Sequence, residues 1–462
     1  MRARASLLAV LSLVLLAAAC GGGGSKGSKG NANALTFWVA EDNAERVKAM
    51  QKILDRFQQQ QHITVKLVAI GEDQLQSQVT NASAAGKLPD AFGALSLGFV
   101  HSLAADDIAD PDAANQVIDA LGRETFNKRA LELVTAGGKP VAVPSDTFTQ
   151  LLLYRKDLFA QAGLQPPDTF ERIRAAADKL NTGGVNGIVA ATVPNDSFTQ
   201  QTFEYFALAN GCQLVDQGGN VTLTSKPCVD TFQFYSDLIK KDSAKGAQDV
   251  DTTRAAYFAG KAAMVVWSSF ILDELAGLRN DALPTCKQCR ADRQFLAKSS
   301  GIITAIKGPD GSQPTQFGEV TSFVITKDGN VDAAKKLVQF MMSDGYVDWL
   351  AFAPEGKFPV RSGTKDQPDR YAKAWEGLKA GVDKREPLSD IYPPDVLKVL
   401  RTSTDTMSRW GFQQGQGKLV GAQLGELPIP KALADQLDGK VDAAGAAKQA
   451  QAAVEEIAQS VK

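Results

Sequence analysis

The side chains with the most distinctive chemistry in this sequence are its five cysteines: Cys20, Cys212, Cys228, Cys286 and Cys289. With Cys20 set aside, the other four form two local pairs, and joining Cys212 to Cys228 would contribute about 3 kcal/mol in the chain-entropy model. Cys286 and Cys289 have a C-x-x-C spacing, which also suits a redox site or half of a zinc site. No second C-x-x-C is present, and the only histidines are His62 and His101. We therefore expect two structural disulfides, which are typical of an oxidising compartment.

An odd cysteine count in an exported protein leaves one thiol to explain, and the residues around Cys20 indicate its role. It follows two arginines, a short apolar run over Leu7–Leu16 and three alanines. The apolar run is about half the length of a membrane-spanning helix, which is typical of an export signal over residues 1–19. The context resembles the lipobox of bacterial lipoproteins, in which the thiol is acylated, although Ala17 stands where that motif prefers Leu. The alanines also fit an ordinary A-x-A cleavage site; we expect lipidation of Cys20.

The composition is that of an ordinary globular protein. The net charge is −2, from 50 basic and 52 acidic residues, and no basic stripe points to a nucleic-acid partner. After residue 20 no stretch is apolar over the roughly 18 residues of a membrane helix, so the lipid would be the only membrane contact. Residues 20–34 combine the lipidated cysteine with a Gly- and Ser-rich tether that spans about 20 Å. We expect a monomer without a cofactor or metal.

Strand-like and helix-like segments alternate from residue 35 onward. Leu35–Val39 predicts a buried strand by its β-branched and aromatic content. Asn43–Gln60 places its apolar residues on one helical face. The same order continues with Ile63–Ile70, Asp73–Ala85 and Ala91–Leu95, and it returns after residue 140. Such alternation predicts an α/β fold in which helices cover a mostly parallel sheet.

Four stretches, in this order, carry a resemblance to a known family. Residues 86–91 read G-K-L-P-D-A, residues 153–170 contain L-Y-R-K-D-L-F, residues 258–270 read F-A-G-K-A-A-M-V-V-W-S-S-F, and residues 333–340 read A-A-K-K-L-V-Q-F. They resemble the extracellular solute-binding proteins of ABC importers, in the carbohydrate-binding class that includes maltose-binding protein. The resemblance covers nearly all of residues 35–462.

The resemblance implies two lobes of the type II periplasmic-binding-protein fold, each a mostly parallel sheet flanked by helices. A ligand would bind between the lobes at the carboxyl ends of the strands. We expect the chain to cross between the lobes near Ser145–Gln150, Ser299–Thr304 and Glu355–Arg361. The lobes would be discontinuous, with residues 35–146 and 305–356 in lobe 1 and residues 147–304 and 357–462 in lobe 2.

A sugar offers hydroxyls at its edges and C–H groups on its faces, so its site needs carboxylates, amides and aromatic rings. Structural roles compete: Asn43 alone suffices as a helix cap, Asp90 suits a turn, and Trp267 and Trp410 suit core packing. The candidate ligand-binding residues lie at predicted strand ends, crossings and the C-terminal helices: Glu41, Asp42, Asp90, Asp146, Trp267, Ser268, Phe270, Glu319, Thr321, Arg361 and Trp410.

The expected function is that of a transport receptor, not an enzyme. It would capture a mono- to oligosaccharide by hinge closure and deliver it to a permease, while anchored to the outer face of the cytoplasmic membrane. The chain has no G-x-x-x-x-G-K-[ST] loop, so ATP hydrolysis would occur on a separate subunit. Two alternatives stay open. The same fold could bind a glycerophosphodiester or another small solute, for which Arg361 is suited, or the protein could be a secreted glycosidase with paired carboxylates.

Overall fold

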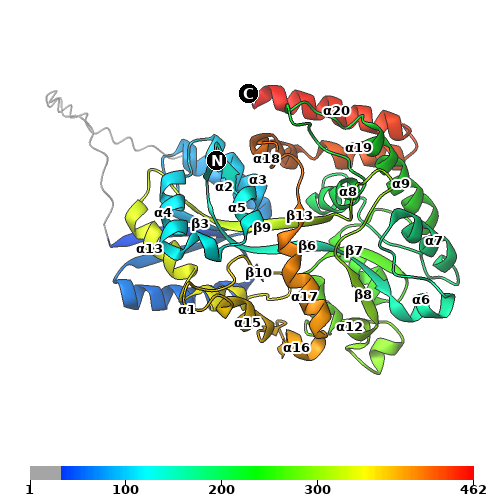
Figure 1. The fold of residues 1–462 in the computed structure, drawn as a ribbon, viewed down its shortest axis with the longest axis horizontal. Coiled ribbons are helices and arrows are strands. Elements are labelled where there is room, and N and C mark those ends of the chain that lie inside the picture. The colour runs from blue at the N-terminus through cyan, green and yellow to red at the C-terminus, as the bar shows by residue number, and fades with distance from the viewer. Residues whose placement is uncertain (1–32, 462) are drawn as a thin grey trace, which may run out of the picture.

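A computed structural model describes residues 33–461 of the chain (Figure 1). The predictions made for the export signal, for Cys20 and for most of the tether lie outside the described residues. In the described part, no helix is both long and apolar enough to cross a membrane. The same residues contain no group of three or more His, Cys, Asp or Glu side chains that could hold a metal ion.

The first lobe is built on three parallel strands that the sequence predicted. β1 (Ala34–Ala40) lies between β2 (Thr64–Ile70) and β3 (Ala91–Leu95) and pairs with both in parallel. Helices cover both faces, as expected for an α/β fold. They are α1 (Ala44–Gln61), α2 (Glu72–Ala84), α3 (Leu97–Ala105), α4 (Pro111–Leu121), α5 (Lys128–Leu133), α13 (Val331–Met341) and α14 (Tyr346–Leu350).

Two long strands connect this lobe to the second one. β6 (Val143–Arg155) pairs antiparallel with β9 (Gln316–Ile325) through its first half, and β9 in turn pairs antiparallel with β3. The second half of β6 pairs with β7 (Met264–Ser268) and β8 (Ser300–Ile303), both antiparallel. One continuous strand therefore belongs to both lobes, and the sheet is parallel within β1–β3 and antiparallel where the chain crosses.

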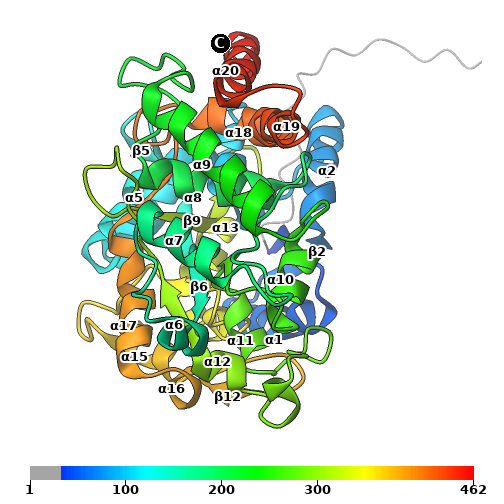
Figure 2. The ribbon, with the colours of Figure 1, turned by 90° about the vertical axis from the view of Figure 1, so that its right-hand side faces the viewer.

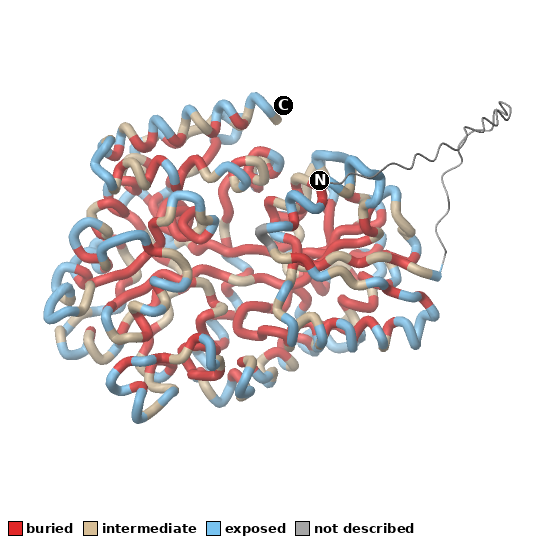
Figure 3. Tube along the Cα trace, turned by 180° about the vertical axis from the view of Figure 1, so that it is seen from behind, coloured by how far each residue is buried: buried red, intermediate tan, exposed pale blue. Residues whose placement is uncertain are grey.

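The helices of the second lobe lie on the other side of these crossing strands (Figure 1). Figure 3 shows the crossing strands buried, while exposed residues lie on the outer helices. The helices are α6 (Lys156–Ala162), α7 (Phe170–Leu180), α8 (Ser197–Ala209), α9 (Lys226–Asp242), α10 (Val250–Phe258), α11 (Ile271–Leu275) and α12 (Phe295–Ser299).

After β9 the chain runs through α13 and α14 and crosses again. β10 (Phe358–Pro359) pairs with β6, and β13 (Met407–Ser408) pairs in parallel with β9. The segment between them contains α15 (Arg370–Glu376), β11 (Lys379–Ala380), β12 (Glu386–Pro387), α16 (Leu388–Ile391) and α17 (Pro394–Thr402). The remaining short elements are β4 (Thr135–Ala136), β5 (Lys139–Pro140) and the 3-10 turns Arg123–Thr125, Gln288–Arg290 and Ser403–Asp405.

The chain ends in three helices that lie together beyond the sheet (Figure 2): α18 (Gly417–Glu426), α19 (Pro428–Leu437) and α20 (Ala443–Ser460). α18 packs against α3 of the first lobe and also contacts α20. The contact with α3 is close, because a Cβ added to Gly421 would lie 2.6 Å from the carbonyl oxygen of Gly98. Only glycine at position 421 allows the two helices to approach this closely.

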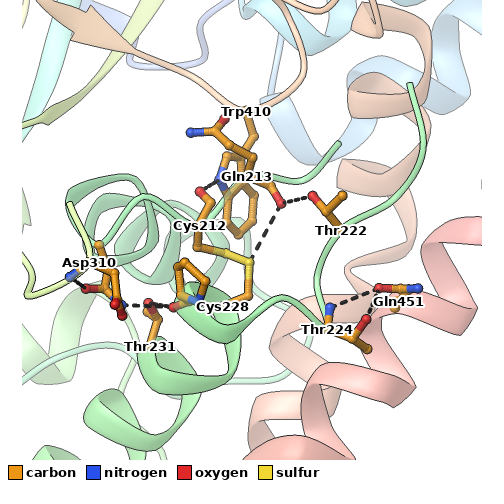
Figure 4. Close-up of a disulfide and its surroundings, with 11 residues drawn as sticks. Cys212, Gln213, Thr222, Thr224, Cys228, Thr231, Asp310, Trp410 and Gln451 are labelled. Atoms are coloured by element: carbon orange, nitrogen blue, oxygen red, sulfur yellow. Dashed lines mark hydrogen bonds between the residues drawn. A yellow bond between two sulfur atoms is a disulfide. The ribbon is translucent and has the colours of Figure 1, made fainter. Parts of the chain in front are cut away.

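Both predicted disulfides are present in the structure. Cys212 pairs with Cys228, which joins the residues after α8 to the first turn of α9 (Figure 4). Trp410 packs beside this bond, and its Nε1 donates a 2.8 Å hydrogen bond to the carbonyl oxygen of Cys212. Cys286 pairs with Cys289, and both residues are buried. The C-x-x-C pair is therefore a disulfide between buried residues.

Candidate functional site

Phe270, in the turn between β7 and α11, lies where the two lobes meet at the carboxyl ends of their strands. On its first-lobe side, the guanidinium of Arg46 on α1 lies 5.9 Å from the ring centroid. Arg46 also pairs with Glu41 at 3.3 Å, directly after β1. The ring of Phe148 on β6 is 5.5 Å from that of Phe270. Glu41 and Phe270, predicted separately, are thus brought together through Arg46.

The last crossing segment packs under the same ring. A Cβ added to Gly356 would lie 2.1 Å from Cε1 of Phe270, so a larger residue could not occupy this position without displacing the ring. Phe270 and Phe148 both stay partly exposed, although their neighbours Ser269 and Thr149 are buried. Two aromatic surfaces are therefore available beside the strands that connect the lobes.

Amide side chains lie next to these rings. Gln150 on β6 pairs across the sheet with Ser268 on β7. Its Nε2 donates a 3.1 Å hydrogen bond to Oε1 of Gln201 on α8. The Oε1 atom of Gln150 is buried without a hydrogen-bond partner. Gln200 is fully buried on the first turn of α8, and neither of its amide atoms has a hydrogen-bond partner within residues 33–461.

Unpaired buried polar atoms lower the stability of the folded state. Each such group costs about 1–3 kcal/mol, so an apolar side chain at the same position would give a more stable fold. Hydroxyls on the same elements are also buried and unpaired, and they belong to Thr147, Thr199, Thr202 and Ser269. The group of neutral donors and acceptors beside two aromatic rings can bind a ligand rich in hydroxyls.

A buried ion network borders the amides and spans both lobes. Arg409, next to β13, pairs with Glu204 on α8 at 3.0 Å and with Glu319 on β9. Oε1 of Glu319 accepts a 2.9 Å bond from the Leu97 N–H at the start of α3. Burial raises the pKa of Glu204. Burial alone would lower the pKa of Arg409, but Glu204 and Glu319 outweigh it and raise that pKa.

This network has a structural consequence for the amide side chains. Glu204 is one helical turn after Gln200 on α8, and it also accepts a 2.8 Å bond from the Trp410 N–H. The start of α8 is therefore fixed relative to β9 and α3, because residues four apart share a helix face. Glu319 and Trp410, both predicted from sequence, take part in this network.

A second charged group lies on the Phe270 side. Asp273 on α11 and Glu355 at the last crossing are both buried, and each has one oxygen without a hydrogen-bond partner. Burial raises the pKa of Glu355, and the charge of Asp273 raises it further. Burial also raises the pKa of Asp273, while Arg279 and Arg46 oppose that shift. Arg46 on α1 thus acts electrostatically on both members of this carboxyl pair.

Several predicted ligand residues have all-protein partners in this structure. Asp146 accepts hydrogen bonds from Thr321 Oγ1 at 2.5 Å and Trp349 Nε1 at 2.6 Å. The ammonium of Lys357 is 3.2 Å from the same carboxylate. Asp90 accepts from two backbone N–H groups, those of Thr36 and Asn330.

Arg361 is buried between two rings and binds backbone and hydroxyl oxygens. Its guanidinium lies 5.2 Å from the ring centroids of both Phe126 and Tyr371. Nε donates to Thr125 Oγ1 at 3.1 Å, and Nη2 donates to the Leu121 carbonyl at 2.8 Å. These contacts tie the last crossing to the end of α4.

The remaining predicted residues divide between core and surface. Trp267 is only 6% exposed, donates to the Val250 carbonyl at 3.0 Å and packs against Phe198. Asp42 is exposed beside Glu41, and Ser268 is partly exposed at the end of β7. Asn43 caps α1 by accepting from two backbone N–H groups, as the sequence predicted.

Five residues of this region were not predicted from the sequence: Arg46, Phe148, Gln150, Gln200 and Gln201. Phe148 and Gln150 lie in the segment predicted to cross between the lobes, and an aromatic and an amide in a crossing strand are a usable signal. The pair Gln200–Gln201 stands in a helix that is otherwise largely apolar, Phe198–Ala209. Arg46 has no such signal, because a cation in the first turns of a surface helix is common.

The sequence and this architecture define the class of the protein. The chain belongs to the bacterial extracellular solute-binding protein family, whose model matches residues 40–348. Among curated proteins, it is 26% identical over 334 residues to a putative ABC transporter periplasmic-binding protein, YcjN, of Escherichia coli K12, covering 71% of this chain and 73% of that protein. It is 26% identical over 245 residues to the arabinooligosaccharide-binding protein of Bacillus subtilis, covering 50% and 53%.

Solved structures of the same architecture cover almost the whole chain. The GacH receptor of Streptomyces glaucescens GLA.O, solved unliganded and with acarbose, matches with a TM-score of 0.69 at 18% identity, over 92% of this chain and 98% of that one. A solute-binding protein of Thermotoga lettingae bound with α-D-tagatose matches with a TM-score of 0.69 at 21% identity, over 93% and 100%. The predicted two-lobed fold is thereby confirmed.

Proposed function

We propose that this protein is the carbohydrate-binding subunit of an ABC importer and that it takes a neutral mono- to oligosaccharide. The observation that carries the proposal is a set of buried amide atoms without partners among the described residues, together with the partly exposed rings of Phe148 and Phe270. These atoms are Oε1 of Gln150 and both amide atoms of Gln200. Amide groups suit sugar hydroxyls, and aromatic rings suit the apolar faces of a sugar. The sugar-related names of the B. subtilis relative and of the structural neighbours support the same class.

Binding would work by closing the lobes around the ligand. β6 belongs to both lobes, so a small change of its twist changes their angle. A sugar that contacts Gln150 and Gln200 from one side and Glu41 and Arg46 from the other gains contacts only when the lobes are closed. Such contacts, present in one state and absent in the other, are what shift a conformational equilibrium.

We propose that the loaded protein docks on permease subunits outside the cytoplasm and is held there by lipid on Cys20. The lobes would comprise residues 35–146 with 305–356 and residues 147–304 with 357–462, and the protein would act as a monomer without catalysis. Mass spectrometry of the mature N-terminus tests the anchor, since diacylglycerol on the cysteine and cleavage after Ala19 both change the mass.

The main test is a thermal-shift screen of the purified chain. The screen compares neutral mono- and oligosaccharides with glycerophosphocholine, a phosphodiester with a neutral headgroup. A separate assay measures whether the protein hydrolyses the same sugars. A sugar at 100 times its Kd should stabilise the folded state by about 2.7 kcal/mol and raise Tm clearly. A rise in Tm with the phosphodiester alone would show that the ligand is a phosphodiester and not a sugar. Hydrolysis of an oligosaccharide would contradict a pure binding role.

A further inference from the structure

We propose that the protein has a second binding site, for a phosphate-class anion, in a cavity between α1 and the turn that joins β11 to β12. The cavity has a volume of about 310 Å³. Four of its lining side chains are cationic, Arg46, Lys48, Lys52 and Arg385, against one carboxylate, Glu45. Arg46 also belongs to the proposed sugar site, whereas Lys48, Lys52 and Arg385 have no role in that proposal.

Three of the four cations of this cavity have no carboxylate partner among the described residues, whereas the fourth, Arg46, pairs with Glu41 at 3.3 Å. Within residues 33–461, Lys48, Lys52 and Arg385 have no carboxylate oxygen within 4.0 Å, the limit for a salt bridge. Arg385 uses only its Nε, which donates to the Gly381 carbonyl at 3.1 Å. Its terminal nitrogens and both ammonium groups are available to an anion.

The geometry suits an oxyanion. Lys48 and Lys52 are one turn apart on the same face of α1, and Arg385 stands across the cavity on the β11–β12 turn. A guanidinium binds two oxygens of a phosphate at once, and ammonium groups add point charges around it.

Phe352 also lines the cavity, whose volume of about 310 Å³ suits a small, compact group. The group that binds is therefore a phosphate that carries at least one full negative charge. It can come from inorganic phosphate or a phosphomonoester in solution, or from the headgroup of an anionic phospholipid.

The walls come from segments that we assign to different lobes, and this consequence rests on the proposed lobe boundaries. α1 and Phe352 belong to lobe 1, whereas Arg385 belongs to the segment assigned to lobe 2. An anion that bridges them favours the arrangement in which the walls are close. By linkage, phosphate and sugar would then change each other's affinity by the same factor.

The experiment measures phosphate binding without sugar, so its outcome is independent of the sugar proposal. The full chain carrying Cys20→Ser, which removes any lipid anchor, is titrated with sodium phosphate by calorimetry at constant ionic strength set with NaCl. The test variant adds Lys52→Gln and Arg385→Gln. The matched control adds Lys128→Gln and Lys373→Gln, whose side chains are 92% and 74% exposed outside the cavity.

We expect phosphate to bind the parent and the control alike and to bind the test variant at least tenfold more weakly. A parallel arm measures co-sedimentation with phosphatidylcholine vesicles with and without phosphatidylglycerol. Binding that requires phosphatidylglycerol and is lost in the test variant, without a response to phosphate, assigns the anion to a lipid headgroup. Equal binding by the parent and the test variant in both arms, or no binding by the parent in either, would overturn the proposal.

Discussion

Packing within the fold does not explain why the amide of Gln200 is buried. It is fully buried, and neither amide atom has a partner among the described residues. Replacing it by Leu removes the cost of two unsatisfied groups, so the free energy of unfolding should stay equal or rise by about 1 kcal/mol. If the amide serves a sugar, the same change should weaken sugar binding at least tenfold. Chemical denaturation and calorimetry measure the two effects separately.

The chain supplies a matched control for this change. Gln423 on α18 is also fully buried, and its two amide atoms likewise have no partner. Gln423→Leu should match Gln200→Leu in its effect on stability and leave sugar affinity unchanged. Equal affinity for the parent and Gln200→Leu would remove α8 from the site.

Side-chain roles were only partly predictable from the sequence, for a physical reason. The Asn43 cap and the cysteine pairs could be predicted because they depend on local spacing. Trp267 and Trp410 could not be assigned, because a Trp ring suits a core as well as a sugar face, and in the structure both rings are buried. Gln200 could have been noticed, because an amide within the largely apolar segment Phe198–Ala209 is unusual in a helix that is buried on nearly all sides.

At the scale of elements, the contact between α3 and α18 can be tested with a pair of glycines on one helix. A Cβ at Gly421 would lie 2.3 Å from Ser102 Oγ and 2.6 Å from the Gly98 carbonyl oxygen. A Cβ at Gly425, one turn later, would meet no atom within 4 Å. Gly421→Ala should therefore lower the free energy of unfolding by about 1–3 kcal/mol through steric overlap.

Gly425→Ala is the control for helix propensity. Alanine is favoured over glycine by about 0.8–1.0 kcal/mol inside a helix, so this variant should be slightly more stable than the parent. Thermal unfolding of both variants measures the difference. If Gly421→Ala is also stabilised, the two helices do not pack as closely in solution as in this structure.

Helix α1 and strands β1–β3 could be predicted from the local sequence pattern. Met50, Ile53, Leu54 and Phe57 form the buried face of α1, as their helical spacing predicts. The parallel strands β1–β3 were predicted from β-branched content and alternation with helices. The antiparallel pairing of β6 with β9 was not predicted, because a strand pair so distant in sequence leaves no local pattern.

At the scale of the whole molecule, Glu355 links stability to pH. Its pKa is raised above the ordinary value of 4.5 because the side chain is buried beside Asp273. Between the unfolded pKa and the raised folded pKa, the folded state holds a proton that the unfolded state has released. Stability should therefore be highest near the lower end of this range and fall as the pH rises through it.

Glu355→Gln tests this assignment, because the amide keeps the shape and cannot ionise. The variant should show a flatter dependence of unfolding free energy on pH above 4.5, the ordinary pKa of the carboxyl group. At the alkaline end of this range the variant should be more stable than the parent. Arg46, Arg279 and Tyr392 also face the carboxyl pair. Parallel curves for parent and variant would assign the dependence to Asp273, the other carboxyl group of the pair, whose pKa is also raised by burial.

The strand shared by both lobes also affects the order of events in biosynthesis. Asp146 on β6 and Thr321 on β9 are bonded across a sequence separation of 175 residues. At roughly 5–20 residues per second, translation needs about 10–40 s to supply the second partner after the first. Until then β3 and the first half of β6 lack their shared partner β9, and pairings this distant in sequence form slowly. We expect the nascent chain to remain unfolded long enough to be threaded through a translocation pore before it folds.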